Sequence, residues 1–254
     1  MADFVEILLS AASLWAWVWI AGAALLAGFL RGFVGFGGAL VVVMTLSVVL
    51  GPLAAVPISF LSGLPSTIQL LPVAWRESER AFVVPFGLAT FFGAPLGAWV
   101  LVSADPAIIK IAISVFVLIM VLMLHRDWRF GGATGAPYLA AAGAAAGFIQ
   151  GVSGIGGPPA VVVALSRPGA APRQRANVIG AVTALSFCAF PPLWYNDLFT
   201  RDVVVISVAV FPLYVAGTWV GSRYFSRQGQ KHFRSAALLL LAGMGVTTLV
   251  LAIL

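Results

Sequence analysis

The sequence predicts an all-α membrane protein that crosses the bilayer several times, and three observations carry this prediction. Hydrophobic residues make up 61% of the 254-residue chain and charged residues only 9%, whereas soluble domains have about 45–50% and about 25%. The mean hydropathy is +1.07. The apolar residues also form runs, many of them near the roughly 20 residues that a membrane-crossing helix needs. The composition excludes an ordinary soluble enzyme, and the single cysteine excludes a disulfide scaffold.

The apolar runs fall into two groups of five, separated by the polar residues 125–129. The first group covers residues 13–30, 34–50, 53–73, 81–103 and 107–124. The second covers residues 137–150, 152–166, 176–195, 202–222 and 235–254. Helices are expected because backbone polar groups in lipid must be satisfied within the segment. The runs also lack the alternation of polar and apolar residues that the strands of a membrane barrel show.

The two groups resemble each other, which predicts an internal duplication. Residues 27–38 (AGFLRGFVGFGG) match residues 146–157 (AGFIQGVSGIGG) at seven of twelve positions. We expect a first membrane repeat at 1–126, a cytoplasmic linker at 127–136 and a second repeat at 137–254. Because each half has an odd number of segments, the second half would start on the opposite side of the membrane. The sequence therefore predicts an inverted repeat, an arrangement common in secondary transporters.

The net charge of +6 indicates an orientation in the membrane rather than a nucleic-acid partner. If every segment crosses, twelve of the fourteen Lys and Arg residues fall on one side. Only Lys110 and Arg201 fall on the other. Basic loops face the cytoplasm, so both termini are predicted on the outer side of the membrane, which is the periplasm for a bacterial protein.

Each half begins with a glycine-rich helical hairpin, for which two arrangements are open. The runs at 137–150 and 152–166 are short for full crossings. Each hairpin therefore either crosses the membrane twice or forms a re-entrant V, and we favour the V. The choice decides whether Arg31 lies at the cytoplasmic surface or at a buried tip.

The glycine-rich turns are candidate binding elements. We expect a small anion to contact Gly35, Phe36, Gly37 and Gly38 in the first turn. In the second turn the candidates are Ser153, Gly154, Gly156 and Gly157. Glycine allows close backbone approach, and a helix N-terminus attracts anions through free N–H groups and its dipole. The alternative is that Gly28, Gly32, Gly147 and Gly151 only allow helices to pack closely.

A few polar side chains inside the apolar runs are further candidates. Arg31 could bind an anion by paired hydrogen bonds, with Gln150 as its counterpart in the second half; alternatively, it extends to the membrane surface. Ser62, Ser66 and Gln69 share one face of a helix with Ser59, either lining a path or bonding between helices. Asn177 is the last candidate, with helix capping as its alternative role.

The two turns, 32–38 (GFVGFGG) and 151–157 (GVSGIGG), resemble those of the sulfite exporter TauE/SafE family of membrane permeases. The resemblance extends over nearly the whole chain through the duplication and the segment spacing. The family pattern typically has another glycine after each Gly-Gly pair, where this chain has Ala39 and Pro158. The resemblance implies transport of sulfite, sulfonates or related small anions across the bacterial inner membrane.

No sequence feature indicates an enzyme or a cofactor. All eight acidic residues and both histidines lie near predicted surfaces, so no proton relay within the membrane is expected. No phosphate-binding loop or metal-ligand cluster is present in the sequence. We expect a secondary transporter for sulfite or a short organosulfonate that works by alternating access. A carboxylate permease and a channel-like anion pore are the alternatives, and proton coupling and a homodimer stay open.

Overall fold

The structure, a computed structural model, describes residues 14–105, 135–167 and 169–227, with residues 108, 109, 111, 115 and 239. These residues form eight helices and no strand, which confirms the all-helical class for the described part of the chain. The first half contains α2 (Leu14–Val34), α3 (Gly38–Leu50), α4 (Pro52–Glu77) and α5 (Arg80–Ser103). The second half contains α7 (Ala136–Ser153), α8 (Gly157–Ser166), α9 (Ala171–Tyr195) and α10 (Arg201–Arg227).

Four of these helices, α4, α5, α9 and α10, are long and apolar enough to cross a membrane. The second arms of the hairpins are much shorter, with 13 residues in α3 and 10 in α8. At 1.5 Å per residue they extend about 20 Å and about 15 Å, less than the hydrocarbon thickness of about 30 Å. The predicted runs at 107–124 and 235–254 and most of the linker at 127–136 lie outside the described residues.

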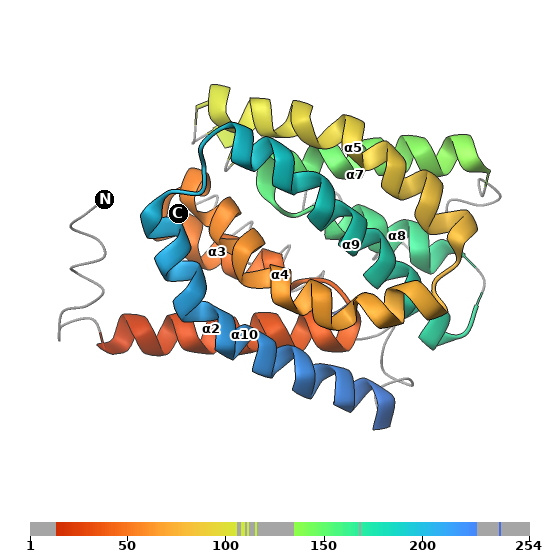
Figure 1. The fold of residues 1–254 in the computed structure, drawn as a ribbon, viewed down its shortest axis with the longest axis horizontal. Helices are drawn as coiled ribbons and strands as arrows, with labels where there is room; N and C mark the ends of the chain where they lie inside the picture. The colour runs from red at the N-terminus through yellow and green to blue at the C-terminus, as the bar shows by residue number, and fades with distance from the viewer. Residues whose placement is uncertain are drawn as a thin grey trace.

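The helices form two outer pairs with four helices between them (Figure 1). Helix α5 packs along α7 on one side of the molecule, and α10 packs along α2 on the other. Helices α4 and α9 lie between these pairs and contact each other, and the short helices α3 and α8 pack against them. Helix α2, the long arm of the first hairpin, therefore packs on α10 of the second half. Helix α7, the long arm of the second hairpin, packs on α5 of the first half.

Glycines make these outer pairs close. A Cβ atom on Gly28 or Gly32 would collide with the backbone carbonyls of Tyr214 and Thr218 in α10. On the opposite side, Gly147 and Gly151 meet the backbone of α5 in the same way. The role of these four glycines in helix packing, which the sequence suggested as an alternative, is confirmed.

The hairpins break later than the apolar runs predicted. Helix α2 continues to Val34 and α7 to Ser153, so the predicted ends at residues 30 and 150 are wrong. Gly32 and Gly151 lie inside helices because close packing, rather than a turn, requires them. The breaks fall just after, where Gly35 (φ +93°), Gly37 (φ +91°) and Gly154 (φ +70°) adopt left-handed backbone conformations that favour glycine.

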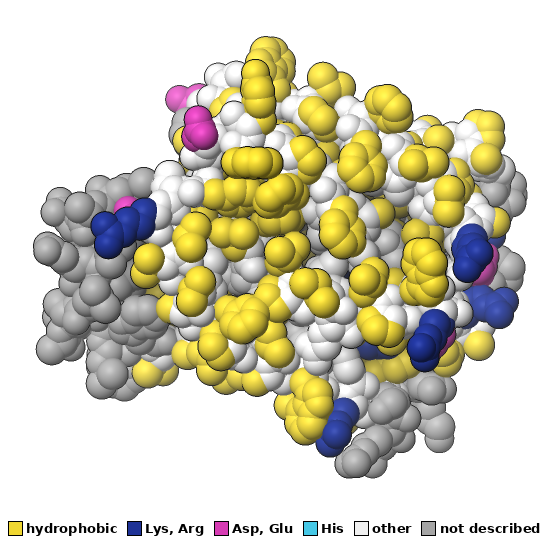
Figure 2. Space-filling view, viewed as in Figure 1, with side chains coloured by type: hydrophobic (Ala, Val, Ile, Leu, Met, Phe, Trp, Pro, Cys, Tyr) yellow, Lys and Arg dark blue, Asp and Glu magenta, His cyan; other side chains and the backbone are white. Residues whose placement is uncertain are grey.

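The outer surface carries many large apolar side chains (Figure 2). On α5 and α10 the side chains of Leu88, Phe92, Trp99 and Val208 are all at least 60% exposed. Monomeric soluble proteins rarely expose contiguous apolar surface on this scale. This surface and the four candidate spans indicate a membrane protein.

Candidate functional site

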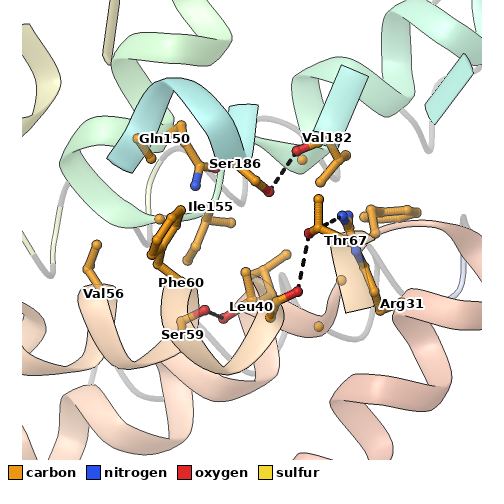
Figure 3. A pocket seen from close by; sticks show the side chains of 18 of the residues that line it. Arg31, Leu40, Val56, Ser59, Phe60, Thr67, Gln150, Ile155, Val182 and Ser186 are labelled. Carbon is orange, nitrogen blue, oxygen red and sulfur yellow. Dashed lines mark hydrogen bonds between the residues drawn. The ribbon is translucent and has the colours of Figure 1, made fainter. Parts of the chain in front are cut away.

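A cavity lies between the two hairpin turns and the middle parts of α4, α9 and α10 (Figure 3). Its volume is about 50 Å³, well above the ~10–15 Å³ that one water molecule needs. Apolar side chains and the glycine backbone of both turns make up most of its wall. Its polar side chains are Arg31, Ser59, Thr67, Gln150, Ser186 and Tyr214.

Arg31 is the charged group of this cavity. It lies near the end of α2 and is only 4% exposed, so its guanidinium does not extend to the protein surface. Nη1 donates to the carbonyl of Gly35 at 2.9 Å, and Nη2 donates to Oγ1 of Thr67 at 3.2 Å. Within the described ranges no carboxylate pairs with it, since the ion pair found there joins Arg167 and Glu79. A buried cation without a counter-charge is costly, which makes the cavity suited to an anion.

The two turns meet at this cavity but offer it different groups. Gly37 and Gly38 line it at the start of α3, whose first residues carry no side-chain cap. Their N–H groups and the positive end of the helix dipole therefore favour an anion. The start of α8 offers fewer donors, because Pro158 and Pro159 have no N–H group.

Gln150 covers part of the second turn. Its Oε1 atom accepts a hydrogen bond from the N–H of Gly156 at 2.8 Å. The amide thereby binds the turn with its oxygen, which leaves the Nε2 group as the donor available to the cavity. Arg31 and Gln150, counterparts in the two halves, thus line the same cavity from opposite turns.

The polar face of α4 reaches the cavity through Ser59 but not through Ser62 or Ser66. Ser62 donates to the carbonyl of Ile58 at 2.7 Å and Ser66 to that of Gly63 at 2.8 Å. Both hydroxyls are therefore satisfied by their own helix. The α4 hydroxyls that line the cavity belong to Ser59 and Thr67.

Half of the predicted binding residues line the cavity. These are Arg31, Phe36, Gly37, Gly38, Gln150, Gly154 and Gly157. The other seven lie outside its lining, namely Gly35, Ser62, Ser66, Gln69, Ser153, Gly156 and Asn177. Several of these still support the lining: Gly35 and Gly156 bind the side chains of Arg31 and Gln150, respectively.

Four polar residues of the cavity lining, Ser59, Thr67, Ser186 and Tyr214, were not among the predicted binding residues. Thr67 follows Ser66 in the chain, and its spacing from Phe60 and Gly63 places it on the cavity side of α4. Tyr214 is a buried tyrosine in the middle of an apolar helix. A phenol in such a run needs a polar partner, which is the signal that could have identified it.

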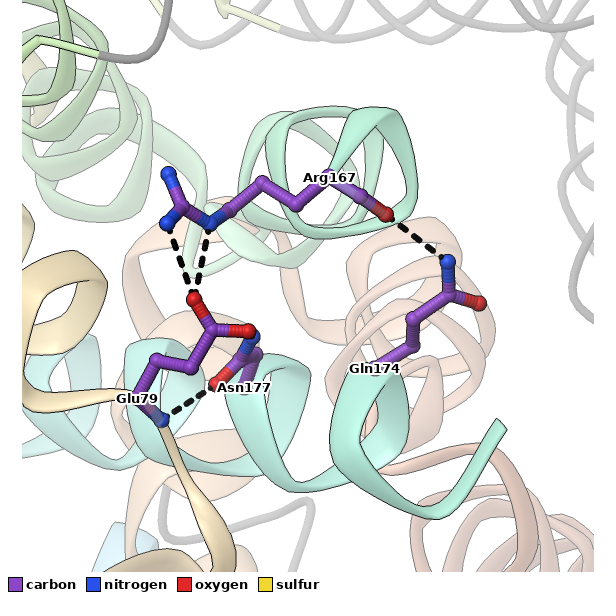
Figure 4. A network of polar contacts seen from close by, with 4 residues as sticks. All are labelled: Glu79, Arg167, Gln174 and Asn177. Carbon is purple, nitrogen blue, oxygen red and sulfur yellow. Dashed lines mark hydrogen bonds and ion pairs between the residues drawn. The ribbon is translucent and has the colours of Figure 1, made fainter. Parts of the chain in front are cut away.

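Asn177 belongs to a polar network at the start of α5, α9 and the end of α8 (Figure 4). Its Oδ1 atom accepts from the N–H of Glu79 at 2.7 Å, and its Nδ2 group donates to Oε1 of Glu79 at 3.2 Å. Arg167 donates to Oε2 of the same carboxylate from Nε (3.1 Å) and Nη2 (2.8 Å). Gln174 donates to the carbonyl of Arg167 at 3.0 Å. The network ties α8 and α9 to the α4–α5 connection.

Arg175 corrects the sequence analysis, which counted it among the cytoplasmic loop residues. It lies in the second turn of α9 and is only 5% exposed. Its guanidinium donates to the carbonyls of Gly32 and Phe33 at the end of α2, and it lies 4.3 Å from the ring of Phe225. Its neighbours Arg173 and Gln174 are polar, so the local sequence resembled a loop.

The described residues offer no obvious site for a metal. No group of three or more His, Cys, Asp and Glu side chains comes together among them. The buried polar residues of this part of the chain include arginines, an asparagine and hydroxyls, without an Asp or Glu. The electrostatic field of the cavity is therefore set by arginine, amide and hydroxyl groups.

Comparison with known proteins agrees with the resemblance in the glycine-rich turns. The family model described as "Sulfite exporter TauE/SafE" matches residues 20–248. No curated protein and no solved structure matched the chain. Since the family match covers far more than half of the 254 residues, the chain belongs to the sulfite exporter TauE/SafE family.

Proposed function

We propose that the chain is a secondary transporter that carries sulfite or a short organosulfonate across the bacterial inner membrane by alternating access. Membership of its family implies a membrane permease for sulfur-containing anions. The site we assign to the anion is the cavity between the two hairpin turns.

The observation that carries this proposal is the buried Arg31 guanidinium without a carboxylate partner in the described chain. Two of its N–H groups are bound to Gly35 and Thr67, which fixes its orientation. A guanidinium has five N–H donors, so others stay available for a sulfur oxyanion. Such charge-assisted, paired hydrogen bonds are short and strong.

The neighbouring groups complete an anion site. The start of α3 contributes backbone N–H groups at Gly38 and the residues after it. Tyr214 and Gln150 contribute side chains that can donate hydrogen bonds, whereas the single O–H of Thr67 donates to the carbonyl of Gly63 and its oxygen accepts from Arg31. We assign the sulfonate or sulfite oxygens to this end of the cavity. The apolar wall, which includes Val56 and Phe60, accepts the carbon chain of a sulfonate.

We further propose that the two halves are inverted repeats with re-entrant hairpins. Two features support this. The contacts of the halves correspond, since α2 packs on α10 as α7 packs on α5. The short helices α3 and α8 are also too short to cross a bilayer of ordinary thickness.

The described arginines support the orientation that the sequence predicts. Exposed Arg76 and Arg173 lie at the ends of α4 and α9 that approach the polar network, whereas Arg201 lies at the other end of the molecule. We assign the arginine-rich end to the cytoplasm, which puts both termini in the periplasm. Proton coupling and a homodimer are further hypotheses that need tests of their own.

Uptake by the purified protein in proteoliposomes tests the function. We expect saturable uptake of sulfite or a C2 sulfonate by the wild type, with little uptake of acetate or other small carboxylates. Preferred uptake of carboxylates would favour a carboxylate permease. An ohmic anion current without saturation would favour a channel-like pore, and uptake of none of these anions would contradict the proposal.

A further inference from the structure

We infer that Arg175 is a positioning residue for the anion site, an inference that rests on the proposed function. It does not line the cavity, yet it holds the end of α2 in the conformation that directs Arg31 and the start of α3 toward the anion.

The hydrogen bonds of Arg175 define this role. The Nε group donates to the carbonyl of Phe33 at 2.9 Å, and Nη2 donates to that of Gly32. These carbonyls belong to the last turn of α2, where C=O groups lack partners within the helix and carry the negative end of its dipole. Arg175 therefore caps α2 from another helix.

This cap lies directly beside the groups that we assign to the anion. Arg31 lies in the same final turn of α2. Its Nη1 group donates to the carbonyl of Gly35, two residues beyond Phe33, whose carbonyl Arg175 binds. Ser222 also donates to the Gly32 carbonyl at 3.3 Å, but its hydroxyl carries no charge, and without the guanidinium of Arg175 these carbonyls would repel an approaching anion. With both guanidiniums in place, the negative end of α2 is neutralised and the positive end of α3 determines the local field.

Helix α9 connects Arg175 to the cavity. Val182, Ser186, Ala189 and Leu193 line the cavity from this helix, and they follow Arg175 at helical spacings of seven, four, three and four residues. Arg175 is thus on the cavity-facing side of α9. Its guanidinium also lies over the ring of Phe225, which restricts its position.

The predicted duplication pairs this arginine with an apolar residue in the other half. At the offset of 119 residues that relates residues 27–38 to residues 146–157, Arg175 corresponds to the buried Val56. Arg31 similarly corresponds to Gln150. Both buried arginines thus lie beside the first turn, where backbone N–H donors at the start of α3 line the cavity. Neither arginine has a charged counterpart at the second turn.

The test is the kinetics of radiolabelled sulfite uptake by Arg175→Met, Arg175→Lys and Arg173→Met in proteoliposomes. Arg173 is exposed on the same helix and is the matched control. We expect Arg175→Met to raise KM at least tenfold with little change in Vmax, and Arg173→Met to keep the wild-type KM. Arg175→Lys should lie between them, because lysine keeps the charge but not the forked geometry.

A wild-type KM in Arg175→Met would overturn the inference, even if Vmax or the yield fell, because that outcome describes a purely structural residue. If Arg175→Met does not fold, Arg175→Lys decides: a KM raised severalfold supports the role, and an unchanged KM rejects it. Absence of sulfite uptake by the wild type would instead contradict the proposed function and this inference with it.

Discussion

The hydroxyl of Tyr214 occupies the space that a Cβ atom at Gly38 would need. The two residues come from opposite halves of the chain, and both line the cavity. The contact brings a phenol against the first residue of α3, so position 38 has no room for a side chain. Glycine at position 38 is therefore required by a neighbour rather than by its own backbone angles.

Gly38→Ala should lower sulfite uptake to less than a tenth of the wild-type rate. The added methyl group displaces Tyr214 and also meets the carbonyl of Ala27, and overpacking of this kind costs about 1–3 kcal/mol. Gly22→Ala is the control, because nothing lies within 4 Å of a Cβ atom there. Equal uptake by the two variants would show that the start of α3 tolerates a side chain.

Arg31→Met should remove anion uptake while leaving thermal stability unchanged or raised. A buried guanidinium without a counter-charge costs folding free energy, and a methionine of similar length fills the space without that cost. Uptake assays and thermal unfolding in detergent measure the two effects. Arg76→Met, at an exposed site, serves as the control. Wild-type uptake by Arg31→Met would remove the residue from the site.

Thr67→Val should raise the KM for anion uptake about tenfold to a hundredfold. Valine keeps the shape of threonine but cannot accept the hydrogen bond from Arg31, and a hydrogen bond to a charged group contributes about 1.5–3 kcal/mol. Ser62→Ala is the comparison, since this buried hydroxyl bonds only to its own helix in the described chain. Similar KM values in both variants would argue that Arg31 is oriented without Thr67.

Glu79→Gln should destabilise the protein by about 1 kcal/mol. The variant loses the ion pair with Arg167. The side chains of Arg167 and Glu79 are 17% and 23% exposed, and partial exposure limits the stabilisation that such a pair provides. A double-mutant cycle with Arg167→Met, measured by unfolding at low and high salt, isolates the pair. A coupling energy near zero would mean that the hydrogen bonds of Asn177 and Gln174 hold this connection without the ion pair.

The assigned orientation can be checked with single cysteines. Arg173→Cys and Asp197→Cys place a thiol at exposed positions near opposite ends of α9. We expect a membrane-impermeant reagent to label the first only from the cytoplasm and the second only from the periplasm. The native Cys188 is buried, so its labelling should be weak, which the wild type checks. Reversed labelling would invert the assigned topology.

The sequence was sufficient for the helical class and the paired glycine-rich turns, because these depend on local composition, whereas it left open whether Arg31 is buried, as the structure has it. It was less informative about which glycines bend the chain. Gly32 and Gly35 have similar neighbours, yet the first packs against α10 within a helix and the second adopts a left-handed conformation. That distinction depends on a helix nearly two hundred residues away.

The same limit explains the missed residues of the site. Arg175 is buried because carbonyls of α2 receive its hydrogen bonds, and no pattern within α9 shows this. Tyr214 enters the cavity because α10 packs on the hairpin of the first half. By contrast, Ser62 and Ser66 formed a clear polar face, but their hydroxyls bond to carbonyls three or four residues earlier, a common local outcome for serine in helices.

The glycine contacts of the outer pairs join α2 to α10 and α7 to α5, and this interlocking has a consequence for how the chain can be divided. A cut between the halves leaves each fragment with a glycine-lined helix whose matching surface is on the other fragment. Neither fragment should assemble alone, whereas the two expressed together should reassociate through these surfaces. We therefore expect the chain to fold as a single unit, although its sequence predicts two repeats.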